Sequence, residues 1–269
     1  MDSLFCDHTP VEEYRVGHKT IFVKRDDLFG RWPAPPLSKL RGLRLLLETE
    51  YAGGTRLVGC WDTRISKLGQ GLAACCAEFP GMKCIVSYPT KKGERRPASV
   101  DQASELGAEI YPVPGSRISI SYSRARKYVE GRGGLMLPFG LECPEAVEGI
   151  KQEASRTPAQ LIRGGTLVLC CGSGVTLAGL LSGLPVLPQR VVGISSGRSL
   201  RNIAACVRRY VEAIPECLEL HEPTMPYSVA LSYDCPFPTH PNYDLKAWKF
   251  LVENLRRYKE PILFWNIGA

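Results

Sequence analysis

Short apolar runs alternate along this chain with longer amphipathic stretches. Runs of branched and aromatic residues predict strands, and apolar residues spaced three or four apart predict helices. The predicted strands are 20–24, 56–61, 83–88, 109–113, 135–138, 166–171, 191–195 and 262–265. The predicted helices are 38–51, 66–78, 99–106, 118–130, 144–159, 175–182, 199–213 and 244–258. Because strand and helix alternate, the pattern predicts an α/β fold with mostly parallel twisted sheets flanked by helices.

Two proline-rich stretches interrupt this rhythm. Residues 31–36 contain three prolines, which predicts a fixed loop before the helix that follows. Residues 223–241 are also predicted to form a loop, and a long loop of this kind often forms the wall of a functional site.

Composition limits the class of protein. Hydrophobic residues make up 44% of the 269 residues and charged residues 23%, as is usual for a soluble globular protein. The sequence has no run of 18 apolar residues, so we expect no membrane span. The 11 cysteines form no CxxC motif and the 4 histidines are scattered, so we expect no metal site. Cysteines in apolar runs behave as small hydrophobic residues, which favours a reducing, cytoplasmic location.

The net charge of +7 has two interpretations. One is a solvated basic surface, and the other is attraction to a polyanion such as DNA. The sequence contains no helix-turn-helix, zinc-finger or RNA-recognition signature, so sequence-specific recognition of nucleic acid is not expected.

A glycine turn follows the apolar strand predicted at 166–171. Small residues at the start of a helix let backbone N–H groups converge on an anion. A Walker loop is excluded because no Gly-Lys-Ser/Thr follows. Taken alone, the turn is as consistent with a tight strand–helix connection as with a phosphate site. Its residues are Gly172, Ser173, Gly174, Val175 and Thr176.

Lys39 lies at the predicted start of a helix. On an average helix such a lysine is a surface residue. At a helix start, however, the helix dipole disfavours a cation and lowers the pKa of the amine. A lysine that forms a Schiff base must be neutral at some stage, so this position suits one.

Several segments, in this order, resemble the 1-aminocyclopropane-1-carboxylate deaminase / D-cysteine desulfhydrase family. That family belongs to the tryptophan-synthase-β-like, fold-type-II enzymes that use pyridoxal 5′-phosphate (PLP). The resemblance covers nearly the whole chain. It is carried by Thr9-Pro10-Val11-Glu12, Lys24-Arg25-Asp26-Asp27-Leu28, Ser38-Lys39-Leu40-Arg41-Gly42-Leu43, Leu106-Gly107-Ala108-Glu109, Gly172–Gly179, Asn242-Tyr243-Asp244-Leu245-Lys246-Ala247 and Ile262–Ala269.

The resemblance implies PLP bound to Lys39, with the turn of residues 172–176 around its phosphate. It also implies a homodimer and two lobes, a large PLP-binding domain of residues 1–49 and 144–269 and a small domain of residues 50–143. Tyr243 becomes an acid–base candidate. Asp244 is expected to face the pyridine nitrogen and keep it protonated. An alternative is that Asp244 caps the helix predicted at 244–258.

The chain departs from the family after the strand predicted at 56–61. The family usually has Gln-Ser-Asn there, and this chain has Asp62-Thr63-Arg64. Thr63 is the candidate to replace the serine in catalysis. Arg64 is a candidate ligand of a carboxylate or of the cofactor phosphate. These changes fall in the expected substrate pocket while the cofactor anchors persist, which indicates PLP chemistry on an unusual substrate.

Three functions follow as hypotheses. The first is a lyase or deaminase that breaks a bond at Cα or Cβ of an amino-acid substrate through a Lys39 Schiff base. The second is a PLP-dependent decarboxylase or lyase that acts on an amino acid attached to a hypermodified base in phage DNA. The third is a catalytically silent binding protein that keeps the fold.

Overall fold

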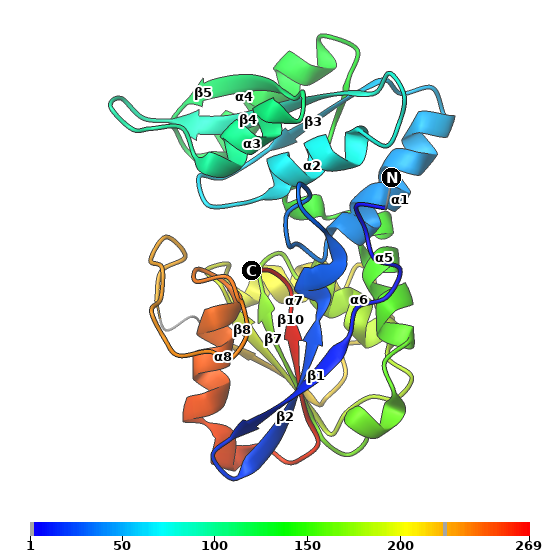
Figure 1. Ribbon diagram of the computed structural model, residues 1–269, viewed down its shortest axis with the longest axis vertical. Coiled ribbons are helices and arrows are strands. Elements are labelled where there is room, and N and C mark those ends of the chain that lie inside the picture. The colour runs from blue at the N-terminus through cyan, green and yellow to red at the C-terminus, as the bar shows by residue number, and fades with distance from the viewer. Residues whose placement is uncertain (1–2, 223–224) are drawn as a thin grey trace. The chain divides into compact units, whose positions relative to one another are not determined.

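The computed structural model describes residues 3–222 and 225–269 and confirms the predicted α/β class (Figure 1). The chain divides into two compact units. One comprises residues 3–5, Gly30–Pro35 and Leu43–Leu141, and is called here the four-stranded unit. The other, the six-stranded unit, comprises Cys6–Phe29, Pro36–Gly42 and Glu142–Ala269. The domains expected from sequence, residues 1–49 with 144–269 and residues 50–143, stay a prediction. A domain is a unit that folds by itself, and compactness alone does not show this.

The six-stranded unit is built on a sheet in which β1 alone runs antiparallel to its neighbour. The other strands run parallel to one another. In spatial order the strands are β1 (Val11–Val16), β2 (Lys19–Arg25), β10 (Ile262–Asn266), β7 (Thr166–Cys171), β8 (Arg190–Ser195) and β9 (Leu218–His221). Every residue of β7 is buried, which is what a near-continuous apolar run in a parallel sheet predicts.

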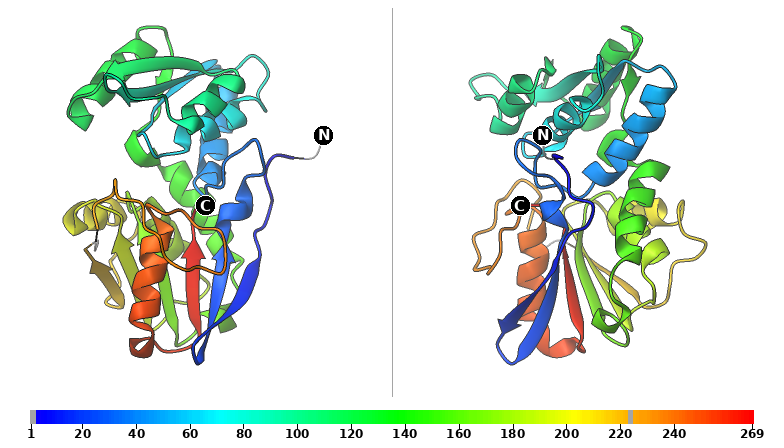
Figure 2. Two further views of the ribbon diagram at one scale, coloured as in Figure 1. Left: turned by 60° about the vertical axis from the view of Figure 1, so that its left-hand side comes forward. Right: turned by 45° about the vertical axis from the view of Figure 1, so that its right-hand side comes forward.

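Helices cover both faces of this sheet (Figure 2). On one face, α8 (Asp244–Glu253) packs Trp248 and Leu251 into the core formed with Val168 and Phe264. On the other face, α5 (Pro144–Ser155) packs against α6 (Val175–Gly183). The helix α7 (Leu200–Val207) joins β8 to β9 and contacts α6.

The four-stranded unit has a parallel sheet in the order β5 (Glu109–Pro114), β4 (Lys83–Thr90), β3 (Leu57–Trp61) and β6 (Leu135–Met136). The helix α4 (Ile118–Glu130) packs Ala125 and Val129 against Ile85 and Val113. The helices α2 (Leu68–Cys76) and α3 (Ala98–Glu105) contact each other. The helix α1 (Leu40–Ala52) supplies its first residues to the six-stranded unit and the rest to this one.

All eight predicted strands and all eight predicted helices are present, and the errors lie at ends and edges. The strands β1 and β9 were not predicted, because β1 is a polar edge strand and β9 has only 4 residues. Four helices end at least two residues before the predicted end: α5 at Ser155, α2 at Cys76, α7 at Val207 and α8 at Glu253. Pro158 explains the first, since the residue before a proline avoids helical geometry.

The two predicted loops behave as expected where they are described. Residues 31–36 and 225–241 contain neither helix nor strand. Residues 223–224 of the second loop lie outside the described residues. Among the helices of residues 3–222 and 225–269, none has the length and apolar character needed to cross a membrane.

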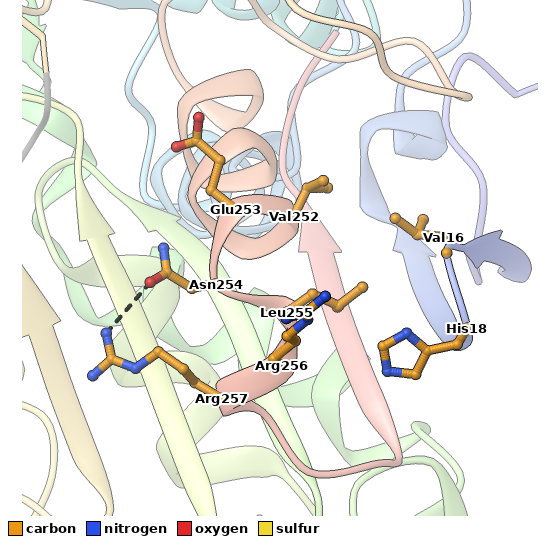
Figure 3. A pocket seen from close by; sticks show the side chains of 9 residues that line it. Val16, His18, Val252, Glu253, Asn254, Leu255, Arg256 and Arg257 are labelled. Atoms are coloured by element: carbon orange, nitrogen blue, oxygen red, sulfur yellow. Dashed lines mark hydrogen bonds between the residues drawn. The ribbon is translucent and has the colours of Figure 1, made fainter.

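A pocket of about 350 Å³ lies at the amino ends of β2 and β10 (Figure 3). Its lining comes from the β1–β2 turn and the end of α8, namely Val16, Gly17, His18 and residues 252–257. Open α/β sheets bind ligands at the carboxyl ends of their strands, so this pocket is at the wrong end of the sheet for the candidate site.

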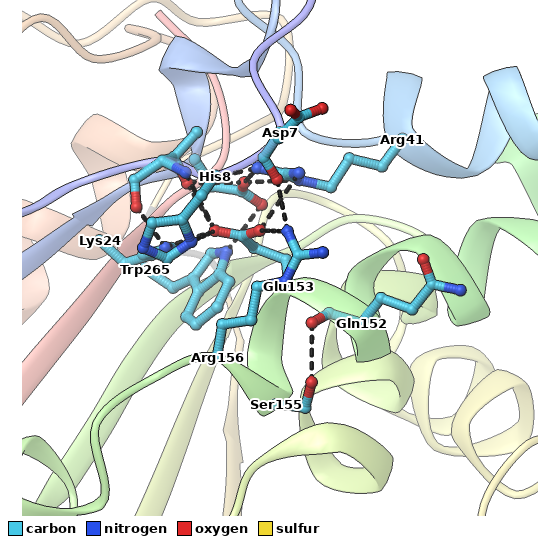
Figure 4. A network of polar contacts seen from close by, with 11 residues as sticks. Asp7, His8, Lys24, Arg41, Gln152, Glu153, Ser155, Arg156 and Trp265 are labelled. Carbon is cyan, nitrogen blue, oxygen red and sulfur yellow. Dashed lines mark hydrogen bonds and ion pairs between the residues drawn. The ribbon is translucent and has the colours of Figure 1, made fainter.

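A cluster of charged side chains is buried where β2 ends (Figure 4). Glu153 of α5 pairs with Lys24 and, at 3.2 Å, with Arg41. Asp26 accepts hydrogen bonds from Arg41 Nε and Nη2 at 3.0 and 2.9 Å, and from Trp265 Nε1 at 3.1 Å. Lys24, Asp26 and Glu153 are each at most 1% exposed, so these are ion pairs removed from water.

The cluster fixes the start of α1 rather than adding much net stability. Burial raises the pKa of Glu153, but Lys24 and Arg41 outweigh it and leave that pKa below its usual value. Because desolvation offsets most of the attraction, a buried network mainly specifies geometry. Close packing helps, since a Cβ on Gly42 would lie 2.1 Å from Cα of Ala146 in α5. Arg41 is held in this way two residues after Lys39.

We predict that Glu153→Ala lowers the free energy of unfolding by about 3–5 kcal/mol, because it leaves Lys24 buried without its carboxylate and removes one of the two carboxylates that Arg41 contacts. Denaturant unfolding measures the change. Glu148→Ala is the matched control on the same helix: its side chain is 46% exposed and makes surface contacts with Lys151 and Gln152, so the expected loss is below about 1 kcal/mol. Equal losses in the two variants would contradict a special role for the buried pair.

Candidate active site

The carboxyl ends of five parallel strands lie along one edge of the six-stranded sheet. The segments that follow β2, β10, β7 and β8 meet there: Asp26–Phe29, residues 267–269, 172–174 and 196–198. Ligands of open α/β sheets bind outside this edge. The side chains on these segments are therefore the candidate site of the six-stranded unit.

Lys39 is brought to this edge by the segment before it. Leu37 forms a bridge with Gly268, and the Ser38 N–H donates to the carbonyl of Ile267 at 2.9 Å. The Lys39 Nζ donates to Ser173 Oγ at 3.0 Å. Lysine and glycine turn, 134 residues apart in sequence, thus come into direct contact.

The electrostatic surroundings of Lys39 suit a nucleophilic amine. Burial lowers the pKa of Lys39, and the neighbouring acidic groups Cys206 and Glu142 offset this only in part. An amine with a lowered pKa is more often neutral and can attack an aldehyde. The helix α1 begins at Leu40 rather than at residue 38 as predicted, so Lys39 directly precedes it.

The glycine turn forms the amino end of α6. Gly174, with φ of +102°, adopts a left-handed conformation that glycine enters without steric cost. Gly174 has no side chain to cap the helix, and the N–H of Val175 donates to Ser173 Oγ at 3.4 Å. The start of a helix without a side-chain cap at this position suits an external anion. Thr176, in that first turn, is buried.

The turn and the lysine together fit the expected cofactor. A Cβ on Gly172 would lie 3.3 Å from Tyr243 Cε1, and one on Gly174 would lie 3.0 Å from the carbonyl oxygen of Ile203, so bare backbone lines this turn. Such a turn at a helix start suits a phosphate. An amine of lowered pKa beside Ser173 suits an aldehyde. PLP carries both groups.

Tyr243 stands beside the glycine turn among aromatic side chains. Its ring centroid is 5.1 Å from that of Tyr227 and 5.5 Å from that of His240, both in edge-on geometry. Burial, with the neighbouring Tyr227, raises the pKa of Tyr243 well above its usual value. The phenol stays protonated at neutral pH and acts as a hydrogen-bond or proton donor.

Asp244 is buried, and its carboxylate holds the segment after β10. It accepts the backbone N–H groups of Ile267 at 3.3 Å and Gly268 at 3.2 Å. These bonds do not cap α8, whose cap position is Tyr243. Burial raises the pKa of Asp244 to about 8 in the protein without cofactor. A place opposite the pyridine nitrogen stays a prediction.

Thr63 and Arg64 lie in the four-stranded unit, and their polar groups are engaged by neighbouring residues. Thr63 Oγ1 accepts the N–H of Ser66 at 3.1 Å. Arg64 Nε pairs with Glu94 at 2.9 Å, and Nη2 donates to the carbonyl of Arg95 at 2.6 Å. The proposed catalytic role of Thr63 and cofactor role of Arg64 stay predictions.

Sequence reasoning passed over other polar groups around Lys39. Glu142 and Arg198 act electrostatically on the Lys39 amine, and Tyr227 packs beside Tyr243. No motif marks these residues. The signal that was available for Arg198 is its position just after β8, at the carboxyl edge of a parallel sheet.

Comparison with known proteins defines the class. The family model described as pyridoxal-phosphate dependent enzyme matches residues 7–234, and the chain belongs to this family. It is a PLP-dependent enzyme, which confirms the predicted cofactor and the prediction of an enzyme.

Individual relatives refine the comparison. A glycyl-dTMP PLP-dependent decarboxylase of Pseudomonas phage M6 is 32% identical over 283 residues, which cover 98% of this chain and 100% of that protein. The tryptophan synthase beta chain of Jannaschia sp. (strain CCS1) is 33% identical over 103 residues, 38% of this chain and 24% of that protein. The crystal structure of an ACC deaminase homologue superposes with a TM-score of 0.78 at 19% identity, covering 99% of this chain and 90% of the other. The fold is therefore the tryptophan-synthase-β-like one, as predicted.

We predict that Lys39→Ala abolishes the visible absorption band of covalently bound cofactor, because Lys39 is the amine proposed to react with the cofactor aldehyde. Spectra of purified protein after dialysis test this. Lys151→Ala, a change of a 47% exposed lysine on α5, should leave the band intact. An unchanged band in Lys39→Ala would place the covalent anchor elsewhere.

A second prediction concerns Asp244 in the cofactor-free protein. Its pKa of about 8 in the folded chain lies above the value of about 4 in an unfolded chain. The folded state therefore binds the proton more tightly, and this contribution to stability is lost as pH rises from about 4 through about 8. Asp244→Asn should flatten the pH dependence of denaturant unfolding across that window. An identical slope in both proteins would argue against the shifted carboxyl.

Proposed function

We propose that this protein is a PLP-dependent decarboxylase whose substrate is an amino acid carried on a thymidylate nucleotide. The observation that carries the proposal is the likeness to the phage glycyl-dTMP decarboxylase, which extends over 98% of this chain and the whole of that protein. Likeness to the ACC deaminase homologue, at 19% identity, supports the fold and leaves the reaction open. The deaminase or β-elimination hypothesis therefore takes second place.

The loop after β3 supports an unusual substrate. The deaminase and desulfhydrase enzymes that the sequence resembles place a serine and an asparagine there against substrate and cofactor. In this chain the Thr63 hydroxyl accepts an N–H of its own loop, and the Arg64 guanidinium is paired with Glu94. The chain thus lacks the usual asparagine, and its substitute is already bound to a carboxylate.

The six-stranded unit supplies the chemistry of such a reaction. The turn of residues 172–176 would hold the cofactor phosphate, and Lys39 the aldehyde. When bound, PLP supplies an electron sink for the bond that breaks at Cα. Decarboxylation releases carbon dioxide and requires one proton to take its place at Cα. Lys39 Nζ and Tyr243 Oη are the candidate proton donors at the carboxyl edge of the six-stranded sheet. The raised pKa of Tyr243 keeps its phenol protonated and therefore able to donate.

A nucleotide substrate also agrees with the net charge of +7, because a positively charged protein attracts the negatively charged phosphate that every nucleotide carries. Contact with DNA through the basic surface stays a prediction, and so does a homodimer.

The test is incubation of the holoprotein with glycyl-dTMP carrying a labelled carboxyl group. We expect labelled carbon dioxide and a nucleotide product shorter by one carboxylate, with no release from free glycine. Lys39→Ala should lower the rate by at least about a hundredfold. Ammonia or a 2-oxo acid without carbon dioxide would favour the deaminase hypothesis. A holoprotein that leaves glycyl-dTMP unchanged would exclude this substrate.

A further inference from the structure

Two arginines from opposite ends of α7 converge on one carboxylate near Lys39. Arg198 precedes the helix and Arg209 follows it. Both use Nη1 to pair with Glu142, Arg198 through Oε1 and Arg209 through Oε2 at 3.4 Å. Glu142 and Arg198 both act on the charge of Lys39.

The cluster also lies close to the glycine turn. A Cβ on Gly174 would be 3.5 Å from Sγ of Cys206, which lies on α7 between the two arginines. The pair thus flanks the proposed cofactor site on the side of β8. Arg198 itself follows β8 at the carboxyl edge of the sheet.

The cluster has more positive charge than its own pairing requires. One carboxylate neutralises one of the two guanidinium groups. Within residues 3–222 and 225–269, Nε and Nη2 of both arginines have no hydrogen-bond partner. The segment 198–209 contains no acidic residue and also carries Arg201 and Arg208. The result is a set of free planar donors with a net positive charge, which is the chemistry that recognises phosphate.

The backbone before Glu142 holds an unusual conformation. Leu141 is a buried non-glycine residue with φ of 54°, and Gly140 before it has φ of 70°. Left-handed geometry at a branched residue persists only where the surrounding structure imposes it. The turn that presents Glu142 to the arginines is therefore fixed by the fold.

We propose that Arg198 and Arg209, held by Glu142, bind the phosphate of the nucleotide that carries the amino acid. This inference rests on the proposed function and assigns the substrate phosphate to residues of this chain. The cofactor phosphate already has the N–H groups of the α6 amino end. The arginines are therefore available for a second phosphate, from a free nucleotide or from a DNA strand.

Thymidine 5′-monophosphate, titrated into the holoprotein by calorimetry with thymidine as the comparison, tests the subsite. We expect wild type to bind the monophosphate at least about tenfold more tightly than thymidine. Arg209→Ala should weaken the monophosphate by about ten- to a hundredfold and leave thymidine unchanged, since it removes one charge-assisted contact. The Arg209 side chain is 55% exposed, so the variant should fold, and its cofactor absorption checks this.

Arg208→Ala is the matched control, because it removes the same charge from the next residue, which is exposed and outside the Glu142 cluster. We expect its affinity for the monophosphate to stay within about twofold of wild type. Arg209→Lys, which keeps the charge but loses the planar fork, should fall between wild type and Arg209→Ala.

Three binding results would overturn the subsite. They are equal binding of thymidine and its monophosphate, an equal loss in Arg208→Ala and Arg209→Ala, and a loss of cofactor rather than of nucleotide in Arg209→Ala. Binding that depends on Arg209, together with no carbon dioxide from glycyl-dTMP, would keep the subsite and reject the decarboxylase. Carbon dioxide release from glycyl-dTMP that is unaffected in Arg209→Ala would keep the decarboxylase and reject the subsite.

Single-stranded oligothymidylate separates the two sources of phosphate. If Arg209→Ala weakens the oligonucleotide as much as the monophosphate, the subsite accepts the phosphodiester of DNA. If only the monophosphate is affected, it recognises the free nucleotide. Either outcome supports a phosphate subsite.

Discussion

The buried pairing of Glu153 with Lys24 and Arg41 is the constraint on which the candidate site depends. These side chains come from α5, β2 and the start of α1, segments distant in sequence, and each would be costly to bury without the others. Their geometry fixes where α1 begins. Lys39 lies immediately before that helix, so a network without a direct chemical role determines where the reactive amine stands.

Parallel topology explains why so much chemistry collects at one edge. Strands that run in the same direction end together, and each end releases a loop that is free to carry polar groups. The glycine turn after β7, Arg198 after β8 and the segment held by Asp244 after β10 are brought together in this way. The opposite edge has its own pocket beside His18, but none of these loops reaches it.

Sequence patterns recovered the parts of the site whose spacing is set by local backbone geometry. The turn Gly172–Gly174 is recognisable because a strand, two glycines and a helix must follow one another for N–H groups to converge. No sequence motif marks Glu142 and Arg198, because they are 56 residues apart in sequence and are brought together only by tertiary packing. Asp244 shows the same limit: its sequence position predicted a helix cap or a cofactor contact, and no pattern indicated that its carboxylate also accepts the N–H groups of Ile267 and Gly268.

Burial gives Lys39 and Tyr243 complementary roles from a single physical cause. Removing water penalises whichever form of a group is charged, so the pKa of the lysine falls while that of the tyrosine rises. Both side chains are thereby favoured in their neutral forms, one as an amine able to attack and the other as a phenol able to donate. The same environment suits any reaction that breaks a bond at Cα. The choice among such reactions must therefore come from groups that orient the substrate, and the arginines on Glu142 are placed to do so.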